Sequence, residues 1–189
     1  MNFEKIIQEN IKENVSNLKK LSEIKYQKQI LKIVKLCIST LKNKKKIMFC
    51  GNGGSAADSQ HLCAELVSKF LKNRKPYSAI SLTTNTSIIT SVSNDFNYSD
   101  IFSKQIEAIG TNGDLLIAIS TSGKSINVIK AIKESKKRKI NTILLSGNKN
   151  KNKSATITFN VPASRVDRIQ ELHIHIGHTI CELIEKTIN

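Results

Sequence analysis

Four hydroxyl side chains lie within one short stretch of the chain, between an apolar run and a segment with helical periodicity. They are Ser120, Thr121, Ser122 and Ser125, and we call residues 120–125 the hydroxyl loop. Hydroxyls and backbone N–H groups at the start of a helix favour an anion, because the helix dipole is positive there. One serine would be explained as an N-cap, but four exceed that role. Since the chain has neither G-x-x-x-x-G-K-S/T nor G-x-G-x-x-G, the loop predicts a site for a monophosphate ester rather than for a nucleotide.

A histidine and a carboxylate follow a second stretch of small residues, 51–55, which we call the glycine loop. His61 and Glu65 are four residues apart, so they project from one face of the helix expected there. Such a pair can ligate a metal ion, act as a general base with its orienting partner, or form a hydrogen bond at the surface. The spacing alone leaves all three open.

The C-terminal segment carries three of the four histidines, His173, His175 and His178, together with Gln170. We expect structural or surface positions for His173 and His175. Gln170 and His178 are eight residues apart, about 12 Å along a helix. Bonds to zinc are only about 2 Å long, so one helix would have difficulty bringing both side chains to one ion. If both belong to one site, a second subunit supplies one of them.

The pattern of elements explains how these residues could meet. Apolar runs at residues 47–50, 115–119, 140–145 and 155–161 predict strands. Helical patterns cover residues 3–41, with a break near Ser22, and also follow the glycine loop, the hydroxyl loop and residue 166. Fully apolar strands that alternate with helices predict a parallel sheet covered on both faces, which binds ligands at the carboxyl ends of its strands. We expect an α/β fold.

Composition agrees with one globular domain, because 189 residues lie within the usual domain size and 39% of them are hydrophobic. The N-terminus is charged and no apolar run reaches about 18 residues, so we expect a cytoplasmic protein without a membrane partner. The four cysteines have no C-x-x-C spacing, which argues against a zinc knuckle or a disulfide framework.

Positive charge is the unusual bulk property, with a net charge of +15. It could indicate a polyanion partner, but almost all of it is lysine, whereas nucleic-acid readers favour the bidentate arginine fork. We therefore do not expect nucleic acid as a partner. Residues 148–153 alternate asparagine and lysine, and we expect them to form an exposed connection without a role in chemistry.

The motifs also resemble one known family when they are taken in order. They are residues 51–61 with Ala64-Glu65-Leu66, then Asn94-Asp95-Phe96, then Ile119 to Ser125, then Asp167 to Ile174. On these residues, and over essentially the whole chain, the sequence is similar to the phosphoheptose isomerases of the sugar isomerase (SIS) domain family. The resemblance implies a three-layer, doubly wound, flavodoxin-like sheet of about five parallel strands. It also implies a single SIS domain over residues 1–189, in which the helices of residues 1–42 pack on the sheet or on a neighbouring subunit.

The activity that this resemblance implies is the interconversion of D-sedoheptulose 7-phosphate and D-glycero-D-manno-heptose 7-phosphate through an enediol(ate). This is the first step of heptose synthesis for bacterial lipopolysaccharide or capsule. Glu65 would be the base that takes the carbon-bound proton, and His178 its acid–base partner. A carboxylate opposite an imidazole suits this chemistry, because both can be tuned toward neutral pH.

The resemblance further implies a set of binding residues and an assembly. Zinc would be held by His61, Glu65, Gln170 and His178, and phosphate by Ser120, Thr121, Ser122 and Ser125. The sugar would contact Asn52, Gly53, Gly54, Ser55, Asn94 and Asp95, with Glu65 and Gln170. A homotetramer with sites shared between subunits is the family expectation. Lys69 stands where many relatives carry arginine, which keeps the charge but loses a bidentate grip, so it is not counted as a site residue.

Two other functions fit parts of the sequence. One is a non-catalytic SIS-domain protein that associates with the bacterial replication initiator, which the positive charge supports slightly. The presence of both Glu65 and His178 counts against it, because a scaffold needs neither. The other is an isomerase of a different ketose phosphate.

Overall fold

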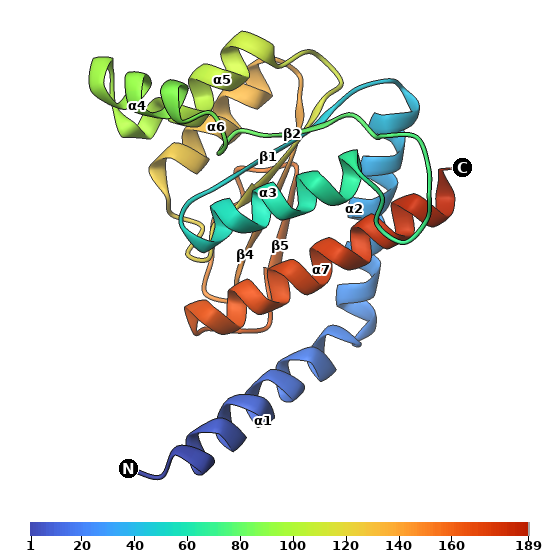
Figure 1. Ribbon diagram of the computed structural model, residues 1–189, viewed down its shortest axis with the longest axis vertical. Helices are drawn as coiled ribbons and strands as arrows, with labels where there is room; N and C mark the ends of the chain where they lie inside the picture. Colours follow the sequence, from blue (N-terminus) through green and yellow to red (C-terminus); the bar gives the residue numbers. More distant parts are fainter. Residues whose placement is uncertain (189) are drawn as a thin grey trace.

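Five strands form one parallel sheet at the centre of the molecule (Figure 1). The structure is a computed structural model and describes residues 1–188. The strands are β1 (Ile47–Gly51), β2 (Ala79–Ser81), β3 (Leu115–Ile119), β4 (Asn141–Gly147) and β5 (Ile157–Val161). Their order is β2-β1-β3-β4-β5 and every neighbouring pair is parallel. This is the flavodoxin-like order, which confirms the predicted fold class.

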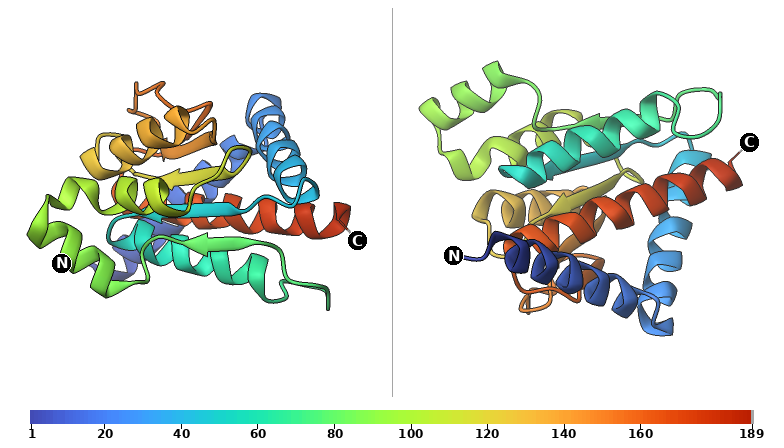
Figure 2. Two further views of the ribbon diagram at one scale, coloured as in Figure 1. Left: turned by 90° about the horizontal axis from the view of Figure 1, so that it is seen from above. Right: turned by 60° about the horizontal axis from the view of Figure 1, so that its bottom comes forward.

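Helices cover both faces of this sheet, as Figures 1 and 2 show. The helices are α1 (Phe3–Leu21), α2 (Ile24–Lys42), α3 (Gly54–Val67), α4 (Thr86–Asp95), the 3-10 turn η1 (Tyr98–Asp100), α5 (Ile101–Ile109), α6 (Ile126–Lys137) and α7 (Val166–Thr187). Side chains alternate along a strand, so Phe49 joins the core under α2, α3 and α7, whereas Met48 joins the core under α5 and α6. The three layers follow from this alternation.

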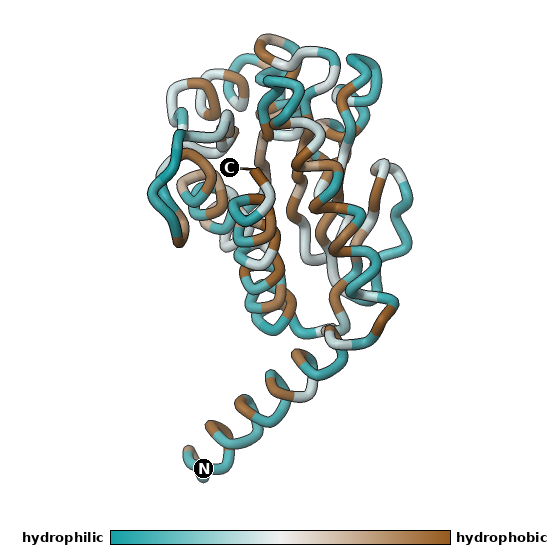
Figure 3. The backbone as a smooth tube through the Cα atoms, turned by 90° about the vertical axis from the view of Figure 1, so that its right-hand side faces the viewer, coloured by the Kyte–Doolittle hydropathy of each residue, from teal (hydrophilic) through white to brown (hydrophobic). Residues whose placement is uncertain are grey.

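The N-terminal helices pack in different ways. Ile33, Val34 and Cys37 of α2 are buried in the core. Helix α1 instead extends away from the sheet (Figure 1), and its apolar residues recur along an exposed face that includes Ile7 and Ile11 (Figure 3). Among residues 1–188 no helix is both long and apolar enough to cross a bilayer.

The asparagine–lysine segment after β4, residues 148–153, makes more contacts with the rest of the protein than its composition predicts. Its lysines are exposed, as expected, but Asn150 is only 7% exposed. The Asn152 Nδ2 donates to the carbonyl oxygen of Gly123 at 3.1 Å. The connection is exposed over most of residues 148–153, as predicted, but Asn150 and Asn152 turn inward and hold the segment against the hydroxyl loop.

Candidate active site

The glycine loop and the hydroxyl loop lie side by side at the carboxyl edge of the sheet. They follow β1 and β3, which are neighbours, and the register pairs Gly51 with Ile119. Helix α3 begins in the first loop and α6 directly after the second. The structure thus brings the two predicted binding loops together at the edge where α/β sheets bind ligands.

In the hydroxyl loop, the side chains are not used to cap the helix. Ser125 is the N-cap residue of α6 but makes no side-chain capping bond. Its Oγ lies instead 3.1 Å from the Oγ of Ser120. Gly123 has a φ of +66°, which favours glycine and folds the loop back on itself. The hydroxyl of Ser122 accepts from the N–H of Lys124 at 3.2 Å and keeps its own hydrogen to donate. That hydroxyl and the first two N–H groups of α6 therefore remain available to an anion.

In the glycine loop, Gly54 is packed closely against α7. A Cβ on Gly54 would lie 2.5 Å from Nε2 of Gln170, so only glycine admits the Gln170 amide at this point. Gly53 has a φ of +55°, and Ser55 is buried. The Asn52 amide is held by Asn127 and Tyr98, neither of which the motifs had indicated.

Helices α3 and α7 lie side by side (Figures 1 and 2). The His61–Glu65 pair of α3 meets His178 of α7 there. His61 Nε2 lies 3.0 Å from Glu65 Oε1, and His178 Nε2 lies 3.3 Å from His61 Nε2. Ligand atoms of all three residues lie within 4.8 Å of one another, so they form a group that could hold a metal ion. We call these three residues the His–Glu–His cluster.

The electrostatic surroundings keep His178 uncharged at neutral pH. Burial lowers the pKa of His178, the neighbouring His61 lowers it further, and the carboxylate of Glu65 opposes both. The ring of Phe70 stacks on the imidazole with centroids 5.5 Å apart. A neutral imidazole is the form that accepts a proton or binds a metal ion.

Around the cluster, two further residues escaped the sequence analysis. Asp58 precedes His61 by three residues on α3; burial raises the pKa of its carboxyl to about 6, against the effect of His61. Arg74 donates through Nη2 to the carbonyl oxygen of Glu65 at 2.7 Å and pairs through Nε with Glu185 at 3.0 Å. Asp58 could have been found from its spacing to His61, whereas nothing in the sequence indicated Arg74.

The remaining predicted site residues lie elsewhere in this chain. Gln170 touches the glycine loop at Gly54, which is seven residues and about 10 Å along α3 from His61. Asn94 and Asp95 are exposed at the end of α4, where the Asn94 Nδ2 donates to Asp95 Oδ1 at 2.8 Å. One chain therefore brings together His61, Glu65 and His178 and leaves Gln170 with the glycine loop.

The other two histidines of α7 do not join the cluster. His175 is exposed. His173 is fully buried, and this burial lowers its pKa to about 4.

Comparison with known proteins gives one consistent result. The family model of the SIS domain matches residues 9–147. A phosphoheptose isomerase of Clostridium acetobutylicum is 46% identical over 186 residues, which cover 96% of this chain and 94% of that protein. One from Aquifex aeolicus is 45% identical over 166 residues, or 86% of each chain.

Solved structures agree with the sequence comparison. A phosphoheptose isomerase from Neisseria gonorrhoeae matches with a TM-score of 0.89 and 35% identity, over 98% of this chain and 100% of that one. One from Francisella tularensis matches with a TM-score of 0.93 and 30% identity, over 99% and 100%. The chain with these two loops and this cluster therefore belongs to the phosphoheptose isomerase family of SIS-domain proteins.

Proposed function

We propose that this protein is an aldose–ketose isomerase that converts D-sedoheptulose 7-phosphate to D-glycero-D-manno-heptose 7-phosphate. The observation that carries the proposal is the His–Glu–His cluster, which places the carboxylate of Glu65 and the uncharged imidazole of His178 within 4.8 Å of each other. The relatives named phosphoheptose isomerase supply the substrate class. We place the product in heptose synthesis for lipopolysaccharide or capsule, and the cytoplasmic location stays a prediction.

The reaction moves one proton between C1 and C2 and another between their oxygens, so it needs a base and an acid. We assign Glu65 to the carbon-bound proton and His178 to the proton on oxygen. The hydroxyl loop and the start of α6 would hold the phosphate, because they present hydroxyls and N–H groups at the positive end of a helix. Asn52, the glycine loop, Asn94 and Asp95 would hold the sugar.

Zinc fits the donor set of the cluster, because two imidazole nitrogens and a carboxylate oxygen lie within reach of one ion. His61, Glu65 and His178 would hold it, with Gln170 as a fourth ligand. When bound, zinc would polarise a sugar oxygen as a Lewis acid. A carboxylate that ligates a metal loses basicity. Binding of zinc by Glu65 therefore competes with its action as a general base.

We further propose that each site is shared between subunits of a homotetramer. Glu65 is eleven residues past Gly54, about 16 Å along α3, so its carboxylate lies near the end of that helix opposite to the glycine loop. From C2 to the phosphorus of the substrate spans about 8 Å in an extended chain of single bonds. One subunit would therefore supply the two loops with Gln170, and its neighbour the His–Glu–His cluster. The exposed apolar face of α1 supports association.

The assignment is tested by assaying wild type, Glu65→Gln and His178→Ala on sedoheptulose 7-phosphate, each with and without a chelator. His175→Ala is the matched control, since His175 is exposed on the same helix outside the cluster. We expect the two cluster variants to lose at least about a hundredfold in kcat, the usual contribution of general acid–base groups, and the control to match wild type. An inactive wild type would contradict the proposed isomerase activity. Full activity in both cluster variants would contradict the roles assigned to Glu65 and His178.

The cluster also separates this proposal from a non-catalytic binding protein. Such a protein would have no turnover to lose, whereas the assay reads turnover directly. An isomerase of another ketose phosphate would act on that sugar in preference to sedoheptulose 7-phosphate under the same conditions.

A further inference from the structure

A buried asparagine that no motif indicated joins the two binding loops. Asn127 is the second residue of α6, two residues after Ser125 of the hydroxyl loop, and only 3% of it is exposed. It forms a reciprocal pair of amide bonds with Asn52, the residue after β1. Asn52 Nδ2 donates to Asn127 Oδ1 at 2.9 Å, and Asn127 Nδ2 donates to Asn52 Oδ1 at 2.8 Å.

A backbone donor fixes the orientation of both amides. The N–H of Val128 donates to Asn127 Oδ1 at 2.9 Å. A backbone N–H can only donate, so the atom that it meets must be the oxygen, and the Asn127 Nδ2 must face Asn52. The atom of Asn52 that faces this Nδ2 must in turn be its oxygen. The amide of Asn52 is therefore held in one of its two orientations.

A third residue completes the bonding of the Asn52 oxygen. The hydroxyl of Tyr98 donates to Asn52 Oδ1 at 3.1 Å. With the Asn127 amide this makes two donors, which occupy both lone pairs of the oxygen. What the Asn52 side chain has left to offer is the second N–H of Nδ2.

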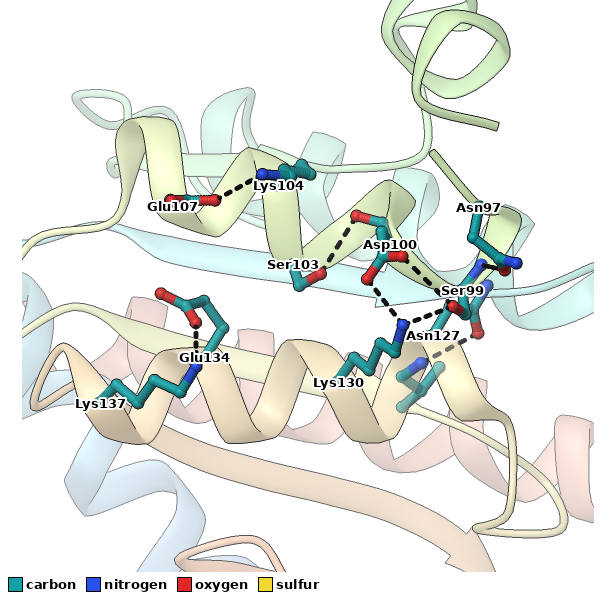
Figure 4. Close-up of polar contacts among 11 residues, drawn as sticks. Asn97, Ser99, Asp100, Ser103, Lys104, Glu107, Asn127, Lys130, Glu134 and Lys137 are labelled. Atoms are coloured by element: carbon teal, nitrogen blue, oxygen red, sulfur yellow. Dashed lines mark hydrogen bonds and ion pairs between the residues drawn. The ribbon is translucent and has the colours of Figure 1, made fainter. Parts of the chain in front are cut away.

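Helix α6 also holds the segment that carries Tyr98. Lys130 lies one turn after Asn127, and Figure 4 shows its ammonium between Ser99 and Asp100. It donates to Ser99 Oγ at 2.7 Å and to Asp100 Oδ1 at 2.8 Å. One face of α6 therefore fixes both partners of the Asn52 oxygen.

We propose that Asn127 is a positioning residue that fixes Asn52 as a hydrogen-bond donor to an oxygen of the bound sugar phosphate. The site would then select for an acceptor oxygen next to the glycine loop. Because α6 starts at the hydroxyl loop, Asn127 also ties the orientation of that donor to the loop that holds the phosphate. The proposal rests on the proposed function, since it names how that site binds its substrate.

A double-mutant cycle tests whether Asn127 acts through Asn52. Asn127→Ala, Asn52→Ala and the double variant are compared with wild type in kcat/KM and in the dissociation constant of sedoheptulose 7-phosphate by calorimetry. Loss of one buried hydrogen bond costs about tenfold, so each single change should weaken both quantities by about that factor. In the Asn52→Ala background, Asn127→Ala should add less than about twofold, because coupled residues are not additive.

A residue with a merely structural role would give a different cycle, with equal losses in both backgrounds. That result, or wild-type values in Asn127→Ala, overturns the proposal. Asn127→Asp serves if the alanine variant fails to fold, since it keeps an acceptor for Val128 and replaces the donor to Asn52 with a second carboxyl oxygen. Lys136→Ala on the exposed side of α6 is the control. Calorimetry separates the proposed isomerase activity from the proposed role of Asn127. If the wild type is inactive but still binds the sugar phosphate, the isomerase activity is contradicted, and the dissociation constants of the four proteins still test the role of Asn127.

Discussion

Gly177 of α7 faces Leu62 of α3, and the contact between them sets how closely the two helices of the His–Glu–His cluster approach. A Cβ on Gly177 would lie 2.5 Å from Cδ2 of Leu62, closer than two carbon atoms can pack. The next residue on α7 is His178, and the residue before Leu62 is His61. Glycine at 177 is therefore what allows the two imidazoles to meet.

Gly177→Ala should force α7 away from α3. Overpacking of a core contact typically costs about 1 to 3 kcal/mol, and we expect a loss of that size in the free energy of unfolding. Because His178 moves with the helix, activity should fall as well. Thermal and urea unfolding measure the loss of stability, and the isomerase assay measures the loss of activity. Gly177→Ala combined with Leu62→Ala should recover activity, since it returns the space; an inactive but stable double variant would contradict this reading.

Sharing of sites between subunits predicts complementation. Ser120→Ala with Ser122→Ala damages the hydroxyl loop, whereas Glu65→Gln damages the cluster, and each homo-oligomer should be nearly inactive. Mixed oligomers would contain some sites with two intact halves, so activity should return to about a quarter of wild type, the share of pairs in which a randomly mixed assembly places both intact halves together. The two variants are unfolded, refolded together and assayed. Activity no greater than the sum of the two inactive proteins would place each whole site within one chain.

Asn152→Ala should weaken phosphate binding although the residue lies outside the predicted site. Its Nδ2 holds the carbonyl of Gly123, and losing this bond frees the hydroxyl loop. We expect KM to rise by about threefold to tenfold, the value of one hydrogen bond, with kcat nearly unchanged. Asn148→Ala is the matched control, because Asn148 lies in the same tract and bonds instead to Ser164. Equal KM values for the two variants would show that Asn152 does not hold the hydroxyl loop for phosphate binding.

Glu185 predicts how stability depends on pH. Its buried carboxylate accepts the N–H groups of Phe70, Leu71 and Lys72 at 3.2, 2.8 and 3.0 Å and pairs with Arg74. Burial opposes ionisation, but these donors and the guanidinium lower its pKa below the usual glutamate value. The unfolded chain then binds the proton first as the pH falls. The stabilisation is thus present above about pH 4.3 and is lost as the pH falls through the lower folded pKa.

Glu185→Gln should remove that dependence. At pH 7 we expect a loss of about 3 kcal/mol, because the change leaves Arg74 without its buried partner. Unfolding is measured from pH 3 to pH 7. The gap between wild type and variant should narrow toward acid pH, and a constant gap over the whole range would exclude this role. Glu182→Gln is the control, since Glu182 pairs with Lys186 at the surface of the same helix.

The fold could be predicted wherever the core leaves a strong pattern. Strands such as Leu115–Ile119 are buried on both faces, so each appears as a continuous apolar run. Between residues 68 and 95 this signal fails. Strand β2 has three residues at the edge of the sheet, and of the residues of α4 only Val92 is buried. Neither buries enough apolar surface to mark its position in the sequence.

The sequence predicted which residues belong to the candidate site, but it could not predict how they are arranged in space. Spacing alone placed His61 and Glu65 on one face, because a helix fixes the relation between residues four apart. The meeting with His178 depends on the packing of two helices that are distant in sequence. Two asparagines that hold the binding loops were not predicted at all. Asn127 and Asn152 belong to ordinary helical or low-complexity segments, and their roles come from single contacts across the fold.

The unused cap at Ser125 has a consequence for how the protein responds to its ligand. A capping bond contributes about 1 kcal/mol to helix stability, and α6 begins without it. An anion in the hydroxyl loop would provide the missing acceptor for the first N–H groups of the helix. The N–H of Val128 already donates to Asn127 Oδ1, so the groups that lack an acceptor are those of Ile126 and Asn127. Local opening of this turn should therefore be the motion that ligand suppresses most, and amide hydrogen exchange at these two residues would report occupancy of the loop while the rest of α6 stays unchanged.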